Sequence, residues 1–400
     1  MLKGKHILLG VTGGIAAYKT ANLASMLVKQ HADVHVIMTK NAQQIISPVV
    51  FEALTGNKVV DDVFCRDSGY QVAHIAMAQE ADVVMIAPAS ANIIAKLANG
   101  IADDMLSTTM LAVTAPVYLV PAMNTHMLEH PATQANLARL KTYGYHIVEP
   151  ASGFLACGDT GRGKMPEADE LIEYLLYEAA YSKDLSGKKV LITAGPTREA
   201  VDPVRFLTNH STGKMGYALA KNAARRGAQT VLVTGPVSLP APLYTTVVPV
   251  TTAQEMYEAV DAHFDTQDLV IMSAAVADYR PRHVAAEKIK KKDSTSVLEL
   301  ERTADILANM SKRKNGQFLC GFSMETQNVL ENSRAKLQKK KIDMIVANSL
   351  RTEGAGFGTD TNVVTILTPD GTETLEKMAK SEVAHRILDR IIAITGKRFE

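Results

Sequence analysis

The chain has few of the residues that several classes of protein depend on. Among its 400 residues there is no tryptophan, aromatic residues make up 5%, and three residues are cysteine. Scarce aromatic side chains argue against a stacking platform for single-stranded nucleic acid. The three widely spaced thiols, Cys65, Cys157 and Cys320, form neither a disulfide framework nor a metal cluster. A few isolated cysteines without a disulfide framework predict a reducing, cytoplasmic setting.

Neither sign of charge dominates. The 43 basic and 42 acidic side chains leave a net charge of +1, which argues against a strongly basic nucleic-acid-binding protein and an acidic disordered chain. The longest stretch without formal charge, Met105–Leu128, contains Pro116 and Pro121 and is a poor membrane span. We interpret it as helix, turn, strand and turn. The first residues lead directly into an apolar strand, so we expect no signal peptide and no membrane partner.

The length suggests two or three domains, and the first part of the chain alternates short apolar strands with helical segments. Such alternation predicts a buried parallel sheet covered by helices. The predicted helix is Ile15–Lys29, and the predicted strands are His6–Thr12, Asp33–Met38, Asp82–Ala87 and Val117–Val120.

The same pattern starts again after a polar join. A helix over Glu167–Ala180 precedes a predicted linker at residues 182–187, and Lys188–Gly195 is a new strand and turn. We therefore predict two Rossmann-like, three-layer α/β domains with mainly parallel sheets, at residues 1–181 and 188–400. The other predicted elements are a helix at 213–227, strands at 230–233, 269–272, 317–320 and 342–347, a hairpin at 363–375 and a closing helix at 376–395.

Two glycine-rich segments resemble phosphate-binding loops. Gly10–Gly14 follows the first strand but lacks the full G-x-G-x-x-G spacing, so a phosphate-binding turn and a plain tight turn both remain open. Gly158–Lys164 fits G-x-x-x-x-G-K, but Met165 stands where a P-loop needs a hydroxyl. The preceding segment 151–157 is expected to be loop-like rather than a strand. We therefore exclude a P-loop and leave a glycine-rich loop that carries one cysteine and two cations.

Two polar residues occur in apolar surroundings. His74 lies in an apolar helical run, where a satisfied core histidine is the more common arrangement. Asn124 follows the predicted strand 117–120, and ligands bind at such strand ends in parallel sheets. A functional role is open for both.

Lysines gather in two runs, at Lys288 with 290–292 and at Lys336 with 339–341. Such runs usually form a solvated basic face. Lys336 and Lys340 are four residues apart and share one face of a helix. Beside a nucleotide-type fold, the two runs also suggest a polyphosphate ligand. We recognise no dedicated metal-ligand cluster.

The first half resembles the flavin-dependent cysteine decarboxylases. Gly13–Lys19 is similar to their flavin turn, Pro88–Asn92 to their PASAN motif, and Pro121–Met127 to their PxMNxxM motif. Residues 156–158 stand where that family has a substrate flap, although Lys164 replaces the usual final arginine. The resemblance implies a flavodoxin-like domain with catalytic His74, Asn124 and Cys157, and FMN bound near Gly13, Gly14, Ile15, Thr39, Ser90, Asn92 and Ser107.

The second half resembles a CTP-dependent ligase. The similar segments are residues 192–199, 202–206, 209–216, 274–279, 288–291 and 321–326. Thr303–Ile306 departs from the usual Asn-Pro-Asp-Ile. The resemblance implies Mg²⁺ on the triphosphate, a role for Lys288 in forming an acyl cytidylate and one for Asn209 in converting it to the amide. It also implies nucleotide contacts from Ala274, Asp278, Lys288, Asp305, Ile306, Phe322, Lys336 and Lys340.

Together, in this order, the motifs resemble the bifunctional phosphopantothenoylcysteine decarboxylase/phosphopantothenate–cysteine ligase family of bacterial coenzyme A biosynthesis. The resemblance implies ligation of 4′-phosphopantothenate to cysteine, then decarboxylation to 4′-phosphopantetheine. It also implies a homo-oligomer, trimeric through the flavin domain and dimeric through the ligase domain. The alternatives are a flavin decarboxylase fused to an NAD(P)-binding reductase and a non-enzymatic flavin-binding regulatory subunit.

Overall fold

The chain forms two compact units, Met1–Ser182 and Lys183–Glu400. The computed structural model describes residues 2–64, 72–154, 158, 160–290, 297–325, 328–349, 356 and 358–396. Leu185 is buried in the core of the second unit, and its N–H donates to the Arg226 carbonyl. The predicted linker at residues 182–187 is therefore anchored to the second unit at Leu185. Within the described ranges, no helix is long and apolar enough to cross a membrane.

The first unit is built on a parallel sheet of five strands with the order β2-β1-β3-β4-β5. This order is that of flavodoxin-like folds, in which β2 is added on one side of β1 and β3 on the other, so that the strand order reverses between β1 and β3. β1 and β3 are apolar and almost completely buried, as expected for strands of a sheet that is covered on two faces. The strands are β1 His6–Val11, β2 Asp33–Met38, β3 Val83–Ala89, β4 Val117–Pro121 and β5 His146–Ile147.

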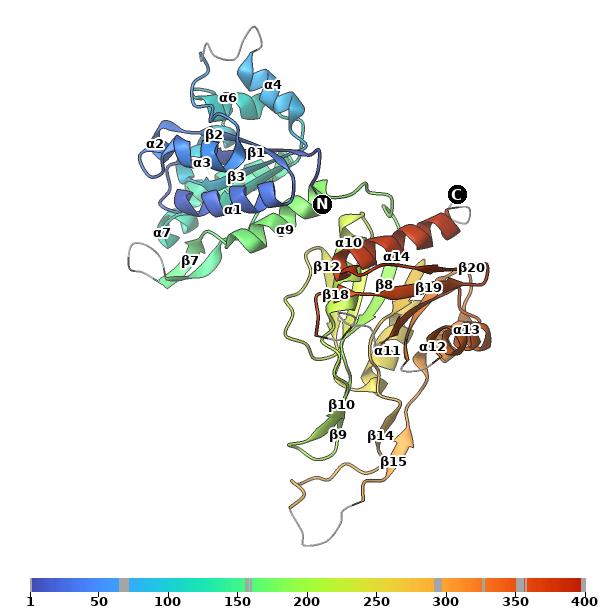
Figure 1. Ribbon diagram of the computed structural model, residues 1–400. Helices are drawn as coiled ribbons and strands as arrows, with labels where there is room; N and C mark the ends of the chain where they lie inside the picture. The colour runs from blue at the N-terminus through green and yellow to red at the C-terminus, as the bar shows by residue number, and fades with distance from the viewer. Residues whose placement is uncertain are drawn as a thin grey trace. The chain divides into compact units, whose positions relative to one another are not determined.

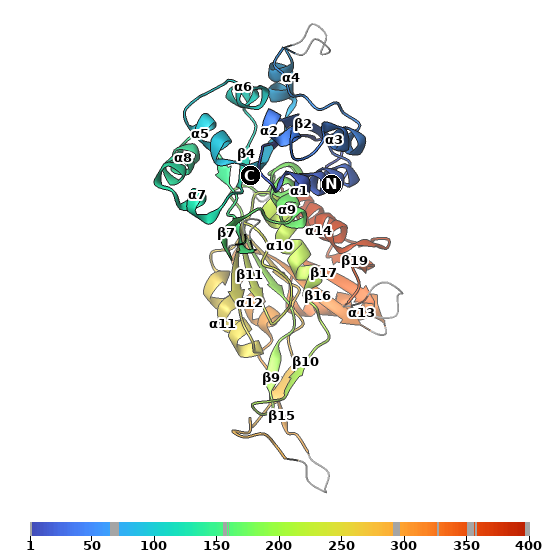
Figure 2. The same ribbon diagram turned by 90° about the vertical axis from the view of Figure 1, so that its left-hand side faces the viewer.

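Helices cover both faces of this sheet (Figures 1 and 2). One face packs against α1 (Ala17–Lys29), α3 (Pro48–Thr55) and α9 (Ala168–Ala179). The other face packs against α4 (Ala73–Glu80), α5 (Ala91–Ala98), α6 (Met105–Ala112) and α8 (Pro131–Thr142). Two short helices, α2 (Lys40–Gln43) and α7 (Thr125–Glu129), follow the carboxyl ends of β2 and β4. The predicted helix, turn and strand of Met105–Leu128 are thereby confirmed, but the predicted final turn is wrong from Thr125 onward, because Asn124 caps a short helix there.

A β-hairpin stands where a loop was expected. β6 (Ala151–Phe154) pairs with β7 (Thr160–Lys164) in antiparallel fashion, so the loop prediction is wrong for residues 151–154. The segment has no regular alternation of apolar residues, so its sequence does not indicate a strand. Backbone contacts hold the hairpin: the Met123 N–H donates to Gly163 O at 3.1 Å. Most of the G-x-x-x-x-G-K run therefore lies in an antiparallel hairpin, which supports the exclusion of a P-loop.

The second unit contains a sheet of eight strands with the order β12-β11-β8-β13-β16-β17-β19-β20. Its first six strands are parallel and follow the Rossmann order, and the last two form the predicted hairpin. The predicted α/β fold class is therefore confirmed. The strands are β8 Lys189–Ala194, β11 Gln229–Thr234, β12 Thr245–Pro249, β13 Leu269–Met272, β16 Phe318–Glu325, β17 Met344–Ser349, β19 Val364–Thr368 and β20 Gly371–Thr374.

This sheet is also a middle layer. α10 (Lys214–Arg225) and α14 (Lys380–Thr395) pack side by side on one face, whereas α11 (Ala253–Phe264), α12 (Ile306–Arg313) and α13 (Val329–Lys340) cover the other (Figure 1). The closing helix starts at Lys380 rather than at the predicted Glu376. The reason is that β21 (Met378–Ala379) first pairs with β18 (Thr361–Asn362).

Two short antiparallel pairs extend beyond one end of the second sheet (Figure 1). They are β9 (Arg198–Ala200) with β10 (Phe206–Thr208), and β14 (Tyr279–Pro281) with β15 (Leu300–Arg302). Each strand has three residues. Such short strands carry too little periodicity to be predicted from sequence.

Candidate functional sites

The first candidate site lies at the carboxyl edge of the first sheet, between β1 and β3, where the strand order reverses. Thr12 ties the two loops at this point together: its hydroxyl donates to Pro88 O at 2.7 Å and accepts from the Ser90 N–H at 3.1 Å. Two cavities of about 410 and 600 Å³ open there and share several wall residues, Gly13, Ser90, Ala91 and Met127 among them. They form one continuous groove, the first-unit groove.

Most of the residues expected near FMN line this groove. Gly13, Gly14, Ile15 and Ser90 lie in one cavity, and Thr39 and Asn92 lie in the other. Ser107 lines neither. It is buried at the start of α6, where its hydroxyl and N–H form a capping box with Asp104.

The groove has the features that a flavin nucleotide needs. A Cβ on Gly13 would lie 2.5 Å from the Cβ of Asn41, so only glycine allows the chain to pass there. Thr39, Ser90 and Asn124 cap α2, α5 and α7, so three helices begin at this edge, and the positive end of a helix dipole favours an anion. The wall also exposes large apolar side chains to solvent, namely Ile15, Tyr18, Met127 and Phe154. An apolar ring system with a phosphate fits this combination.

The structure brings only part of the expected catalytic set together. Asn124 lines the groove, and its side-chain oxygen accepts from the His126 N–H at 2.9 Å. His74 lies on α4 outside the lining of both cavities, and its buried Nδ1 has no hydrogen-bond partner among the described residues. Cys157 lies outside the described residues.

Asp104 stabilises the wall of the groove. It caps α6 and pairs with Lys96 at 2.7 Å. Burial alone would raise the pKa of Asp104, but hydrogen bonds from Lys96 and Ser107 lower it overall. Because the folded pKa lies below the unfolded one, this stabilisation is present at neutral pH and lost as the pH falls through the folded pKa.

We expect Asp104→Ala to lower the free energy of unfolding of the first unit by about 1–2 kcal/mol at pH 7. Urea denaturation followed by circular dichroism measures this loss. The difference between wild type and variant should shrink as the pH falls below the ordinary aspartate pKa of about 3.9 and through the lower pKa of the folded state. Asp103→Ala is the matched control, because Asp103 pairs with the same lysine at 2.6 Å but is exposed and caps no helix. Equal losses for the two variants would contradict the capping role.

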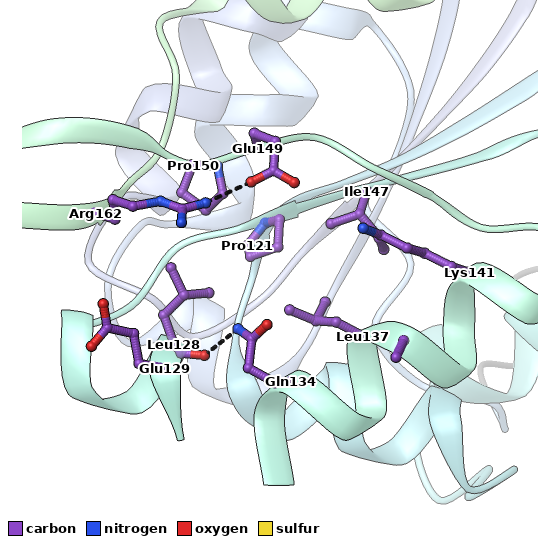
Figure 3. A pocket seen from close by; sticks show the side chains of 11 residues that line it. Pro121, Leu128, Glu129, Gln134, Leu137, Lys141, Ile147, Glu149, Pro150 and Arg162 are labelled. Carbon is purple, nitrogen blue, oxygen red and sulfur yellow. Dashed lines mark hydrogen bonds and ion pairs between the residues drawn. The ribbon is translucent and has the colours of Figure 1, made fainter. Parts of the chain in front are cut away.

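A third cavity of about 330 Å³ lies beside the hairpin of the first unit (Figure 3). Its polar groups bind one another: Arg162 pairs with Glu149 at 2.8 Å, and the Gln134 amide donates to Leu128 O at 2.6 Å. None of the residues expected to act in catalysis or binding lines it. The first contact joins the hairpin to the segment after β5 and the second joins α8 to α7, and we assign the cavity no chemistry.

The second candidate site lies between β8 and β13, where the strand order of the second sheet reverses. Pro196 and Ala275 form an isolated bridge at this point, and a cavity of about 410 Å³ opens beside it, the second-unit cavity. The amino end of α10 and the carboxyl ends of β16 and β17 contribute to its wall. Four of the expected residues line it: Asn209, Ala274, Asp278 and Phe322.

The other expected residues of the second unit lie around this cavity. Lys336 donates to the wall residue Ser323 at 3.4 Å. Lys340 pairs with Asp305 at 2.8 Å, and Asp305 caps α12 just before the buried Ile306. Burial opposes ionisation of Asp305, but the hydrogen bond from Lys340 lowers its pKa overall.

Lys288 is exposed and does not line the cavity. The next residue, Ile289, is held in place: its N–H donates to Asp202 at 3.1 Å, and its carbonyl accepts from Arg205 at 3.0 Å. The Arg205 guanidinium also holds the pKa of Asp202 well below its usual range. Lys288 therefore projects from a segment that is anchored at one residue.

Lys214, Lys380 and Asn348 are among the polar residues of the cavity wall that were not predicted. Lys214 at the start of α10 donates to Gly358 O at 2.9 Å, and Lys380 donates to Thr359 O at 2.6 Å. Burial lowers the pKa of Lys380, and Lys214 lowers it further. Asn348 is 6% exposed, and its Oδ1 has no hydrogen-bond partner among the described residues. Its position at the end of β17 is the one signal in the sequence that could have singled it out.

Comparison with known proteins gives the class of this chain. Residues 1–179 match the Flavoprotein family, and residues 185–394 match the family described as DNA/pantothenate metabolism flavoprotein C-terminal domain. The chain is thus a flavoprotein domain joined to a second domain of pantothenate metabolism. It belongs to the family of coenzyme A biosynthesis bifunctional proteins called CoaBC, which are decarboxylase–ligase enzymes.

The relatives match over their full length. The Coenzyme A biosynthesis bifunctional protein CoaBC of Bacillus subtilis (strain 168) is 48% identical, and the alignment covers 100% of both chains. The protein of the same name from Escherichia coli (strain K12) is 42% identical over 98% of this chain and 97% of its own. The crystal structure of a CoaBC C-terminal domain is 46% identical and covers 54% of this chain and 100% of its own, with a TM-score of 0.47. The resemblance predicted from the motifs is confirmed.

Proposed function

We propose that the second unit joins 4′-phosphopantothenate to L-cysteine with CTP, and that the first unit decarboxylates the product with FMN. The observation that carries this proposal is that each unit has an opening of ligand size at the point where the strand order of its own sheet reverses. Each opening is lined by residues of the motifs that match one of the two activities. The full-length similarity to bifunctional relatives supports the pairing of the activities in one chain.

In the first unit, the first-unit groove binds FMN through Gly13, Gly14, Ile15, Thr39, Ser90 and Asn92. Bound FMN supplies a reversible two-electron acceptor for the carbon that carries the thiol, which makes loss of CO₂ feasible. Asn124 lies in the same groove and orients the substrate carboxylate with its side-chain amide. His74 handles the substrate proton and Cys157 donates a proton in the final reduction. Ser107 supports the groove through its cap on α6.

In the second unit, the substrate carboxylate attacks the α-phosphorus of CTP, pyrophosphate leaves, and the amine of cysteine then displaces CMP. Cations must disperse the charge that develops during phosphoryl transfer. Lys288 serves this first step, and Lys336 and Lys340 bind the nucleotide beside Asp278, Phe322 and the Asp305–Ile306 turn. Lys214, Lys380 and the amino end of α10 receive the triphosphate.

Asn348 contributes to binding of the base. Its buried Oδ1, which has no hydrogen-bond partner among the described residues, can accept a hydrogen bond from the exocyclic amine of cytosine. Asp278 is the one carboxylate that lines the described part of the cavity. We therefore propose that Mg²⁺ arrives with CTP and is held mainly by phosphate oxygens and water.

We expect Asn209→Ala to stop the reaction after activation. Asn209 lies in the cavity wall and would orient the acyl cytidylate for attack by cysteine. The variant should release pyrophosphate in the first turnover and accumulate acyl cytidylate, with amide formation slowed by about 100-fold or more. Rapid quench with mass spectrometry measures both products. Amide formation at the wild-type rate would remove this role from Asn209.

The assembly and the setting of the enzyme complete the proposal. We propose a homo-oligomer that is trimeric through the first unit and dimeric through the second, working on small molecules in the cytoplasm. Sedimentation velocity of the full chain tests the assembly. A monomer at the concentrations used for activity would contradict it.

One assay tests the function as a whole. The purified chain receives 4′-phosphopantothenate, cysteine, Mg²⁺ and either CTP, ATP or no nucleotide, and the products are identified by mass spectrometry. We expect 4′-phosphopantetheine, CMP and pyrophosphate with CTP. Accumulation of phosphopantothenoylcysteine would contradict the role of the first unit. Absence of CMP would contradict the role of the second and favour a reductase or regulatory protein.

A further inference from the structure

A cluster of two histidines and an aspartate lies at the amino edge of the first sheet. His6 opens β1 and Asp33 opens β2, and the parallel register pairs these two residues directly. His35 follows two residues after Asp33 and therefore points to the same face of the sheet. His6 Nδ1 lies 3.2 Å and His35 Nε2 lies 3.3 Å from the same carboxylate oxygen, Asp33 Oδ2. All three atoms lie within 4.8 Å of one another.

The two separations from Asp33 Oδ2 are those of ligand atoms around one small metal ion. A tetrahedral zinc ion with ligands at about 2.0–2.1 Å holds neighbouring ligand atoms about 3.4 Å apart. His6 Nδ1 is buried and makes no hydrogen bond within the described residues, although its ring is partly exposed. Its near neighbour is Asp33 Oδ2 at 3.2 Å, and two such acceptor atoms lie this close only when a proton or a cation is shared between them.

The surroundings support metal binding. Asn57 donates to the other oxygen of Asp33 at 2.8 Å and thus fixes the carboxylate as an outer-shell partner does in metal sites. The backbone N–H of His6 donates to Asp82, which also pairs with Lys5, so the start of β1 is held in place.

The cluster has room for further ligands. His6 and His35 line a small recess together with Glu80 at the end of α4. Glu80 is exposed and can supply a carboxylate oxygen by side-chain rotation, and water can complete the shell. Two imidazoles with one carboxylate and an open position suit zinc and its first-row neighbours rather than Mg²⁺.

From this geometry we propose that His6, Asp33 and His35 form a binding site for a divalent transition-metal ion of the zinc type. The site lies at the amino ends of β1 and β2, whereas the first-unit groove follows their carboxyl ends. Its metal is therefore separate from the Mg²⁺ that accompanies CTP. It crosslinks two neighbouring strands, so binding stabilises the first unit.

Calorimetric titration of the chelator-treated full chain with ZnCl₂, without nucleotide, tests the proposal. We expect wild type to bind one zinc ion per chain. His35→Gln should reduce the zinc affinity at least about 10-fold, and His6→Gln should cause a similar loss. Asn57→Ala should weaken binding in the same direction. His263→Ala on α11 is the matched control, a histidine of the second unit that should leave the affinity unchanged. Titration with MgCl₂ should show no binding at this site.

A second readout separates metal binding from loss of fold. Flavin absorbance and circular dichroism of the glutamine variants should match wild type, and zinc should raise the thermal midpoint of wild type but not that of His35→Gln. Absence of zinc binding to wild type, or equal affinity in wild type and a folded double variant of His6 and His35, would overturn the proposal.

Discussion

Asn124→Asp should lower the rate of decarboxylation by about 100-fold or more while CTP-dependent ligation continues unchanged. The Asn124 side chain has two functions in this position. Its oxygen caps α7 by accepting from the His126 N–H, and its amide group faces the first-unit groove. Aspartate keeps the cap because a carboxylate oxygen accepts the same bond. It removes the donor and places a negative charge beside the substrate carboxylate.

Two assays on the same preparation measure this separation. Decarboxylation is followed with synthetic phosphopantothenoylcysteine, and ligation is followed as CMP release. Thermal unfolding should show little change in the first unit. Asn124→Ala serves as a comparison, because it loses both the cap and the donor and should also lower stability by about 1 kcal/mol. Near-wild-type decarboxylation by Asn124→Asp would exclude a role for this amide.

Gly235→Ala should destabilise the second unit by about 3 kcal/mol or more and abolish CTP turnover. Gly235 follows β11, and its N–H donates to Ala194 O at the end of β8 at 3.0 Å. The two turns at this edge are in backbone contact. A Cβ on Gly235 would lie 1.8 Å from Pro196 O. No rotation of a side chain relieves a clash with a carbonyl oxygen, so the turns must separate. Pro196 also bridges to Ala275, which lines the second-unit cavity.

Gly371→Ala is the matched control for this prediction. Gly371 lies in the β19–β20 hairpin, and a Cβ there would meet no atom within 4 Å. This change should leave stability within about 0.5 kcal/mol of wild type. Urea denaturation measured by circular dichroism, with CMP release as the activity, distinguishes the two variants. Equal behaviour of Gly235→Ala and Gly371→Ala would show that the backbone contact is not required.

The sequence predicted the strands that are buried on both faces. Leu269–Met272 and Asp33–Met38 were located within their observed limits because a continuous apolar run is a local property. The strands of the two projecting pairs were missed, as was β6, because their stability depends on partners far along the chain. Asn124 could be recognised for the same local reason, since it follows a clear strand.

The sequence by itself determined the α/β class, the duplication of the pattern and the motifs that place the chain in its family, because these depend on periodicity and on residues close in the chain. Only the tertiary structure decided which strand ends meet. It brought Asn348 and Lys380 to the second-unit cavity, and it placed Ser107 under a helix cap rather than in the first-unit groove. It also aligned His6 with Asp33. Such neighbours are set by strand order and register, which arise from contacts between segments distant in sequence.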